Sequence, residues 1–290
     1  MHERRLRTSE WSSAGPQTPI NTDHTHDLNK YQLGKNANYQ EIRSSAVNFN
    51  KFLKRQFKDG GIVGVNYTYS HGINNYDDNS DATAPSIGGT SVLMVPYLPD
   101  FNRNRGTSGF DRKHNLQIYE TYTLPFGKGY TLLNDGIGAK LAGGWTLSNV
   151  ISRESGTPFT VQASATSLNA PGNSQFANQL VPKVKILGGH DATHPYFDPT
   201  DFAPVTTATF GTAGYNDVRG PGLFLLNTSL FRTFAFSERF KLQMRGEAFN
   251  LTNTPTFGTP GANVSTASSY DIISTASNQR TLRFSARLEF

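Results

Sequence analysis

The 290-residue chain contains no cysteine, so disulfide-stapled folds, thiolate zinc sites and thiol catalysis are excluded. Charge is also scarce, since Asp, Glu, Lys and Arg make up 17% of the residues, against about 25% in an ordinary soluble domain. Mean hydropathy is −0.48, and no apolar run approaches the roughly 18 residues that a membrane-spanning helix needs. We therefore expect no helical membrane domain.

The basic residues form no stripe. The net charge is +5, and apart from Arg4, Arg5 and Arg7 the basic residues are spread thinly. A nucleic-acid-binding protein concentrates Lys and Arg on one surface, so we expect no nucleic-acid partner. No apolar segment follows these arginines, so the sequence shows no secretory signal peptide. Either the protein is cytoplasmic or its true N-terminus lies further upstream.

The clearest pattern lies at the C-terminus, over residues 279–290. Apolar side chains there alternate strictly with polar ones; the apolar set is Leu282, Phe284, Ala286, Leu288 and Phe290. Such period-2 alternation predicts a strand with one apolar and one polar face. At roughly 3.4 Å per residue and about 45° tilt, a strand of this length covers about 30 Å, the thickness of a bilayer core.

The same two-faced pattern recurs upstream. It covers residues 39–57, 61–73, 112–125, 140–155, 223–236 and 240–252. Lys51, Arg55, Phe231 and Arg232 break it locally. The connections alternate between short ones (58–60, 126–139, 237–239) and long ones rich in Gly, Pro, Ser, Asn and Asp (71–111, 156–222, 253–278). Short periplasmic turns and long extracellular loops in alternation are typical of a transmembrane β-barrel.

Aromatic residues fall near both ends of these segments, as the interfacial girdles of a barrel would require. The band near the short links contains Phe57, Phe126, Tyr130, Phe234, Phe236, Phe240 and Phe290, and the band near the long links contains Tyr69, Phe110, Phe159, Phe224 and Phe249.

We therefore predict an all-β fold, an antiparallel up-and-down transmembrane β-barrel segment of about seven long strands with long extracellular loops, located in the outer membrane. Residues 1–38 are expected to form an irregular N-terminal loop, and residues 39–290 the C-terminal portion of the barrel. Single-chain bacterial barrels have an even number of strands, and open sheet edges are not tolerated in lipid. We therefore expect an incomplete barrel that belongs to a longer protein.

Several fragments together are distinctive. They are Asn66–Ser70 (NYTYS), Asp111–His114 (DRKH), Gly144–Trp145 (GW), Ser155–Phe159 (SGTPF), Tyr196–Pro199 (YFDP), Gly220–Gly222 (GPG), Asn227–Phe234 (NTSLFRTF), Arg245–Gly258 (RGEAFNLTNTPTFG) and Arg287–Phe290 (RLEF). In this order they resemble the C-terminal β-barrel of Oar-like TonB-dependent outer-membrane transporters.

This resemblance implies energised uptake of an unknown substrate. It also implies partners: outer-membrane lipid, the barrel-assembly machinery, and an N-terminal plug with further barrel strands, through which the protein would couple to TonB. Such transporters have barrels of about 22 strands, of which the segments counted here are about a third. Phe290 matches the terminal Phe that the family presents to the assembly machinery, and is assigned that role. A passive porin-like barrel and a soluble β-sandwich adhesin or glycan-binding module stay open as alternatives.

Charged residues on the polar sides of the last two segments are candidates for the inner wall of the barrel. They are Arg245, Glu247, Arg283, Arg287 and Glu289. Opposite charges two positions apart suggest a neutralised wall, and no substrate site can be named. Serine-hydrolase, zinc-protease, Walker and Rossmann motifs are absent from the sequence, so we expect no enzyme.

Metal ligands occur only in loops. The histidines and carboxylates are His24, His26, His190, His194 and the neighbouring Asp23 and Asp27, and the oxygen ligands suited to Ca²⁺ are Asp77, Asp78, Asp81, Asp198 and Asp201. None has the spacing of a defined metal motif. We therefore expect no cofactor, with loop-bound Ca²⁺ as the one alternative.

Overall fold

A computed structural model describes residues 45–57, 61–74, 86–87, 90–91, 102–130, 132–168 and 174–290 of the chain. The expected N-terminal loop at 1–38 lies outside the described residues. So do the candidate metal ligands at 23–27 and 77–81.

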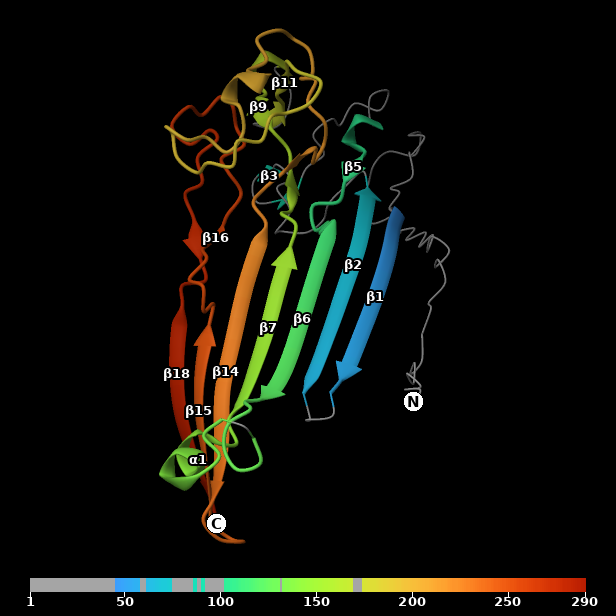
Figure 1. Ribbon diagram of the computed structural model, residues 1–290. Coiled ribbons are helices and arrows are strands. Elements are labelled where there is room, and N and C mark those ends of the chain that lie inside the picture. Colours follow the sequence, from blue (N-terminus) through green and yellow to red (C-terminus); the bar gives the residue numbers. More distant parts are fainter. Residues whose placement is uncertain are drawn as a thin grey trace.

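Seven long strands form one antiparallel sheet in which neighbours in the chain are neighbours in space (Figure 1). They are β1 (Ser45–Gln56), β2 (Ile62–Asn74), β6 (His114–Thr123), β7 (Thr146–Glu154), β14 (Leu223–Ala235), β15 (Lys241–Phe249) and β18 (Thr281–Glu289). Each falls within one residue of a segment with the period-2 pattern. The predicted all-β, up-and-down architecture is confirmed.

One strand begins later than expected. The pattern predicts a strand over residues 140–155, but β7 starts at Thr146 because residues 136–142 form the short helix α1 (Gly136–Ala142). Gly144 then adopts a φ of +75°, a conformation that an extended strand cannot contain. The glycine pair Gly143–Gly144 thus separates helix from strand.

Apart from α1, the remaining elements are short and lie in the long links. They are β3 (Ser86–Ile87), β4 (Thr90–Ser91), β5 (Gly106–Thr107), β8 (Pro158–Phe159), β9 (Gln162–Ser164), η3 (Thr166–Leu168), β10 (Ser174–Phe176), β11 (Asn178–Gln179), η4 (Pro199–Asp201), β12 (Phe202–Ala203), β13 (Val218–Arg219), β16 (Thr256–Phe257) and β17 (Ala276–Ser277). None of the helices in the described ranges has the length and apolar content that spanning a bilayer requires.

The strand register places the alternating apolar set of each of the seven strands on the same face. One row across the sheet runs Leu53, Val65, Ile118, Ile151, Leu226. Because paired residues of an antiparallel sheet point to the same side, a slip of one residue in any strand would move its apolar set to the other face. The two faces, here called the apolar face and the polar face, are therefore continuous across the sheet.

The apolar face is uncovered. Phe284 is 82% exposed, and Leu282 and Leu288 beside it are more than half exposed. Within the described residues, the long strands form a single sheet and no second sheet packs on this face. This arrangement rules out the β-sandwich alternative, which requires two sheets that bury these residues against each other.

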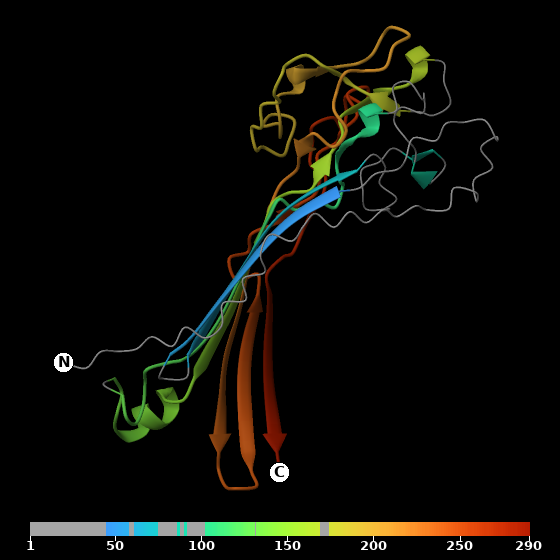
Figure 2. The same cartoon turned by 90° about the vertical axis from the view of Figure 1, so that its right-hand side faces the viewer.

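The links alternate as predicted. The described parts of the three long links (102–113, 155–168 with 174–222, and 250–280) lie at one end of the sheet. The described parts of the short links (124–130 with 132–145, and 236–240) and the strand ends at residues 57 and 61 lie at the other end (Figures 1 and 2). In an outer-membrane barrel the long links are extracellular and the short ones periplasmic. We call the described residues 102–113, 155–168, 174–222 and 250–280 the cap.

The hydrophobic core of the molecule lies in the cap and not in the sheet. The cluster of buried apolar residues is Phe159, Val161, Ala163, Phe176, Ala177, Tyr196, Phe197, Phe202, Val205, Ala213, Tyr215 and Val218. The prediction was therefore wrong for two members of the aromatic band near the long links. Phe159 is fully buried in this core. Phe249 pairs with Thr281 and lies on the polar face, because its neighbour Ala248 lies on the apolar face.

A charge on the apolar face should block membrane insertion, whereas the same charge on the polar face should be tolerated. We expect Phe284→Arg to destabilise the inserted protein by about 2–4 kcal/mol, the cost of a cation at the bilayer midplane. The neighbouring Ser285→Arg, on the polar face, is the matched control. Heat-modifiable gel mobility of the outer-membrane fraction measures the folded population. Equal loss in both variants would contradict the assignment of the faces.

Candidate functional site: the polar face and the cap

Uncharged polar side chains hydrogen-bond across the polar face of β6 and β7. The Ser152 hydroxyl donates to Gln117 Oε1 at 2.7 Å, and Gln117 Nε2 donates to Asn115 Oδ1 at 3.2 Å. Thr121 and Ser148 join their hydroxyls at 3.3 Å. Partners that are satisfied within the sheet hold their rotamers, so this part of the face is a preorganised polar wall.

Charged pairs occupy the same face on β15 and β18. Arg245 lies 3.5 Å from Glu247, and Arg287 lies 3.5 Å from Glu289, measured between side-chain nitrogen and oxygen. Arg283 reaches Glu247 from the next strand at 4.0 Å. All five candidates from the sequence therefore lie on the polar face and pair with one another. That this face lines a barrel interior stays a prediction for these residues.

Aromatic rings flank these arginines. The Arg245 guanidinium lies 5.0 Å from the centre of the Phe231 ring, and that of Arg283 lies 5.4 Å from the Phe249 ring. This contact explains why Phe231 breaks the sequence pattern: its side chain belongs to the polar face, where it packs under a cation.

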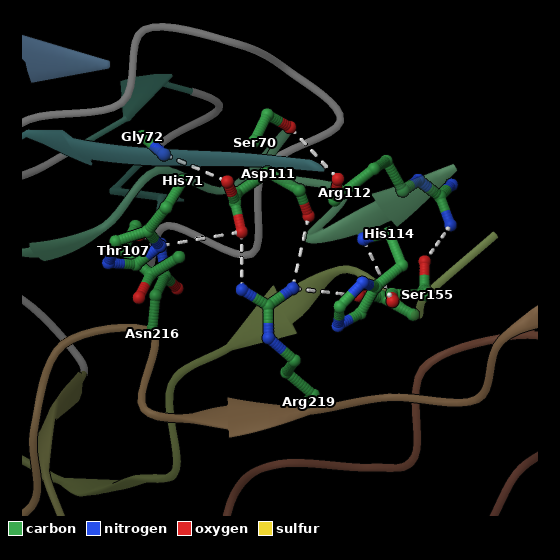
Figure 3. A network of polar contacts seen from close by, with 11 residues as sticks. Ser70, His71, Gly72, Thr107, Asp111, Arg112, His114, Ser155, Asn216 and Arg219 are labelled. Carbon is green, nitrogen blue, oxygen red and sulfur yellow. Dashed lines mark hydrogen bonds and ion pairs between the residues drawn. The ribbon is translucent and has the colours of Figure 1, made fainter. Parts of the chain in front are cut away.

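The cap is tied to the sheet by Asp111, whose side chain is almost fully buried (Figure 3). One carboxylate oxygen accepts a hydrogen bond from the backbone N–H of Gly72 at 2.8 Å, and the other forms an ion pair with Arg219. Arg219 also donates to the backbone oxygens of Asp111 and Gly156. One carboxylate and one guanidinium thus connect the end of β2, the link before β6, the start of the second long link and β13.

A second set of contacts closes the strand ends beside this pair (Figure 3). His114 and Ser155 exchange backbone and side-chain hydrogen bonds, and Arg112 donates to the Ser155 backbone oxygen at 2.9 Å. The Tyr67 hydroxyl lies 2.8 Å from His114 Nδ1. The fragments DRKH and SGTPF, chosen from the sequence without a structural role, therefore meet at one place.

Asn216 provides a third connection. It adopts a φ of +52°, and its Nδ2 donates to the backbone oxygen of Thr107 at 2.8 Å. Its backbone N–H donates to the Thr160 hydroxyl at 2.9 Å. Asparagine tolerates left-handed backbone better than most residues, so this residue fixes the turn before β13 and links two long links at once.

Asp271 joins the third long link to the second. Its carboxylate accepts hydrogen bonds from the backbone N–H of Phe197 at 3.1 and 3.3 Å. Burial raises its pKa to about 6, although the Phe197 N–H opposes that shift. The pKa of Tyr196 rises to about 12, mainly through burial and secondly through the Asp271 charge.

The candidate metal ligands in the cap make contacts with neighbouring protein groups. His190 stacks on Phe257 with ring centres 5.1 Å apart. Asp191 accepts hydrogen bonds from Thr193 and from the His194 backbone, which hold the pKa of its carboxyl below the usual range. Asp198 caps η4 by accepting from Thr200, while Asp201 accepts from the Lys185 N–H.

Within the described ranges, no group of three or more His, Asp or Glu residues is arranged to hold a metal ion.

Three residues that connect the links of the cap were not among the candidates from the sequence. Arg219, Asn216 and Asp271 stand in loop sequence with no periodicity, and only the DRKH fragment gave a signal for Asp111.

Comparison with known proteins agrees with this architecture. A family model described as an outer membrane beta barrel domain matches residues 2–283. No curated protein and no solved structure matches the chain.

Removal of Arg219 should release the cap from the sheet. We expect Arg219→Met to destabilise the cap by about 3 kcal/mol, because it leaves the buried Asp111 carboxylate without its guanidinium partner, with only the Gly72 N–H and His71 at 3.8 Å beside it. Arg112→Met is the matched control: it loses an ion pair with the partly exposed Glu154 and a hydrogen bond to the Ser155 backbone oxygen, but it leaves no buried charge behind, and exposed pairs of this kind contribute less than about 1 kcal/mol. Hydrogen exchange of residues 102–113 and 156–222 measures the effect. Equal exchange in the two variants would contradict this role.

The cap should be more stable in acid than at neutral pH. Because the folded pKa of Asp271 is raised above its ordinary value of 3.8 to about 6, its contribution is fully present below about pH 4 and is lost as the pH rises through 6. We expect slower hydrogen exchange of residues 190–201 and 261–273 at pH 4.5 than at pH 7, after correction for intrinsic rates. Asp271→Asn should abolish the difference, and an unchanged difference would show that another group titrates.

Proposed function

Because the chain belongs to the outer membrane beta barrel domain family, we propose that it forms the C-terminal part of the barrel of an Oar-like, TonB-dependent outer-membrane transporter for energised uptake of a substrate still to be identified. The observation that carries the proposal is the polar face, which is continuous over seven strands and ends beneath a folded cap. A wall of this kind suits the contact surface of a plug and the lining of an import pathway.

The edges of the sheet support the need for further strands. The described strands leave β1 and β18 at the two ends of the sheet. With seven antiparallel strands, both edges run from the cap towards the short links. Antiparallel closure therefore needs an odd number of additional strands, whose own two edges run the opposite way. We propose that such strands and a plug are partners of this chain, together with lipid, the barrel-assembly machinery acting on Phe290, and TonB through the plug.

The charge pattern of the wall favours a plugged transporter over an ion-selective pore. Arg245 with Glu247 and Arg287 with Glu289 neutralise each other locally, whereas selective pores present rings of one sign. In this proposal the wall binds and guides but carries out no reaction, and neither a cofactor nor nucleic acid takes part. A passive porin-like barrel is the second candidate, since it shares the same fold.

The two candidates differ in conductance and in the coding sequence upstream of Met1. For a plugged transporter we expect an in-frame plug with a TonB box, and no steady conductance when the intact protein is placed in a planar lipid bilayer. The plug explains the closed state, because it fills the lumen that the polar face lines. A signal peptide directly followed by barrel strands, together with a steady open conductance, would establish the porin instead.

A further inference from the structure

The link between β6 and β7 is unlike the other two short links because it contains a folded element. Residues 124–130 and 132–145 of this link include α1, which lies at the periplasmic end of the sheet and to one side of the strands (Figures 1 and 2). A turn of this length is not needed to join two neighbouring antiparallel strands.

Two side chains fix α1 on the side of the apolar face. Trp145 Nε1 donates to the backbone oxygen of Leu141 at 2.9 Å, and Arg232 donates to the same oxygen at 2.8 Å. Arg232 pairs with Met244 in the register and so belongs to the apolar face, and its guanidinium lies 4.2 Å from the Phe234 ring centre. The Trp145 and Phe234 rings meet edge to face at 6.3 Å. The C-terminal end of α1 therefore lies beside the surface that faces lipid.

The rest of the link packs against the inner side of α1. Gly127 approaches Gly143 so closely that a Cβ on Gly127 would lie 2.6 Å from the Gly143 Cα, and the Gly127 N–H donates to the Leu132 backbone oxygen. Ala139 and Ala142 are half-buried on this side. The compact turn thus presents its larger apolar residues outwards.

Four large apolar side chains point away from the protein at this place. Ile137 is 76% exposed and Leu141 is 64% exposed, and they share one side of α1 at a spacing of four residues. Leu132 and Leu133, in the turn before α1, are each more than half exposed. The described residues of the link also expose two cations, Lys128 and Lys140, and one acidic side chain, Asp135. Apolar side chains bordered by cations, level with the end of a lipid-facing sheet, have the composition of an interfacial membrane anchor.

We propose that the link between β6 and β7 is a lipid-binding anchor that inserts Leu132, Leu133, Ile137 and Leu141 into the periplasmic leaflet of the outer membrane. Lys128 and Lys140 then lie at the level of the phosphate groups, where they attract anionic phospholipids. Lipid is favoured over a protein partner because the patch continues the apolar face of the sheet. The turn can move away from the sheet only if the hydrogen bonds of both Arg232 and Trp145 to the Leu141 oxygen break.

The experiment uses the absence of native cysteine. Ile137→Cys in the intact protein is labelled with a polarity-sensitive bimane and reconstituted in vesicles of phosphatidylcholine with phosphatidylglycerol. We expect blue-shifted emission and several-fold stronger quenching by doxyl-labelled lipid than at Glu238→Cys, in the short link between β14 and β15. Phe284→Cys marks the lipid-exposed strand, and Leu180→Cys marks the aqueous side of the cap. Leu133→Cys repeats the test if Ile137→Cys does not fold.

Two results would overturn the lipid anchor, and a third would overturn the role assigned to its lysines. The first is emission and iodide quenching at residue 137 equal to those at Glu238→Cys, which would place α1 in water. The second is protection from both lipid and aqueous quenchers, which would show that protein covers the patch. The third concerns charge. In vesicles with phosphatidylglycerol, Lys128→Gln/Lys140→Gln should make the label at residue 137 shallower, whereas in pure phosphatidylcholine its depth should not change. If the double substitution leaves the depth unchanged in both kinds of vesicle, the cations have no role.

Discussion

The backbone hydrogen bonds between the seven strands are the interactions on which the whole structure depends. In hydrocarbon, an unpaired N–H or C=O costs several kcal/mol, so each strand must find its neighbour along its full length. The resulting register has a second effect. It aligns the parity of every strand, so that Leu53 on β1 and Phe284 on β18 lie on the same face although more than two hundred residues separate them in the chain. The lipid surface and the polar wall both follow from this one ladder.

This constraint also explains why the core lies outside the sheet. A sheet with lipid on one side has no need of a second apolar layer, so its strands contribute nothing to the buried cluster. The cap stands in water and must fold by burial of its own side chains, as a soluble domain does. Its attachment to the sheet includes polar contacts such as the Asp111–Arg219 pair, in which the carboxylate is almost fully buried. Such a pair adds less to stability than to the choice of one arrangement, because any other docking leaves a charge unpaired.

The sequence was sufficient for the parts of the fold that depend on periodicity. Period-2 alternation identified every long strand and its lipid-facing side, and glycine-rich composition identified the long links. It was insufficient where several links meet. Asn216 and Asp271 act through backbone conformations and partners from other links, and a single sequence carries no record of such pairings. Phe159 was placed in an aromatic band because aromatic residues suit both an interface and a core.

Two residues that break the alternation, Phe231 and Arg232, show where the sheet makes other contacts. Phe231 on the polar face packs under Arg245, and Arg232 on the apolar face binds the end of α1. These two departures from the pattern mark places where a strand contacts something other than lipid or water. In a membrane sheet, an isolated cation on the apolar face is costly unless a partner or a phosphate lies within reach. The Arg232 contact with Leu141 supplies that partner, and it couples the position of α1 to the register of β14, so that the link between β6 and β7 can hold its place only when the sheet itself is correctly assembled.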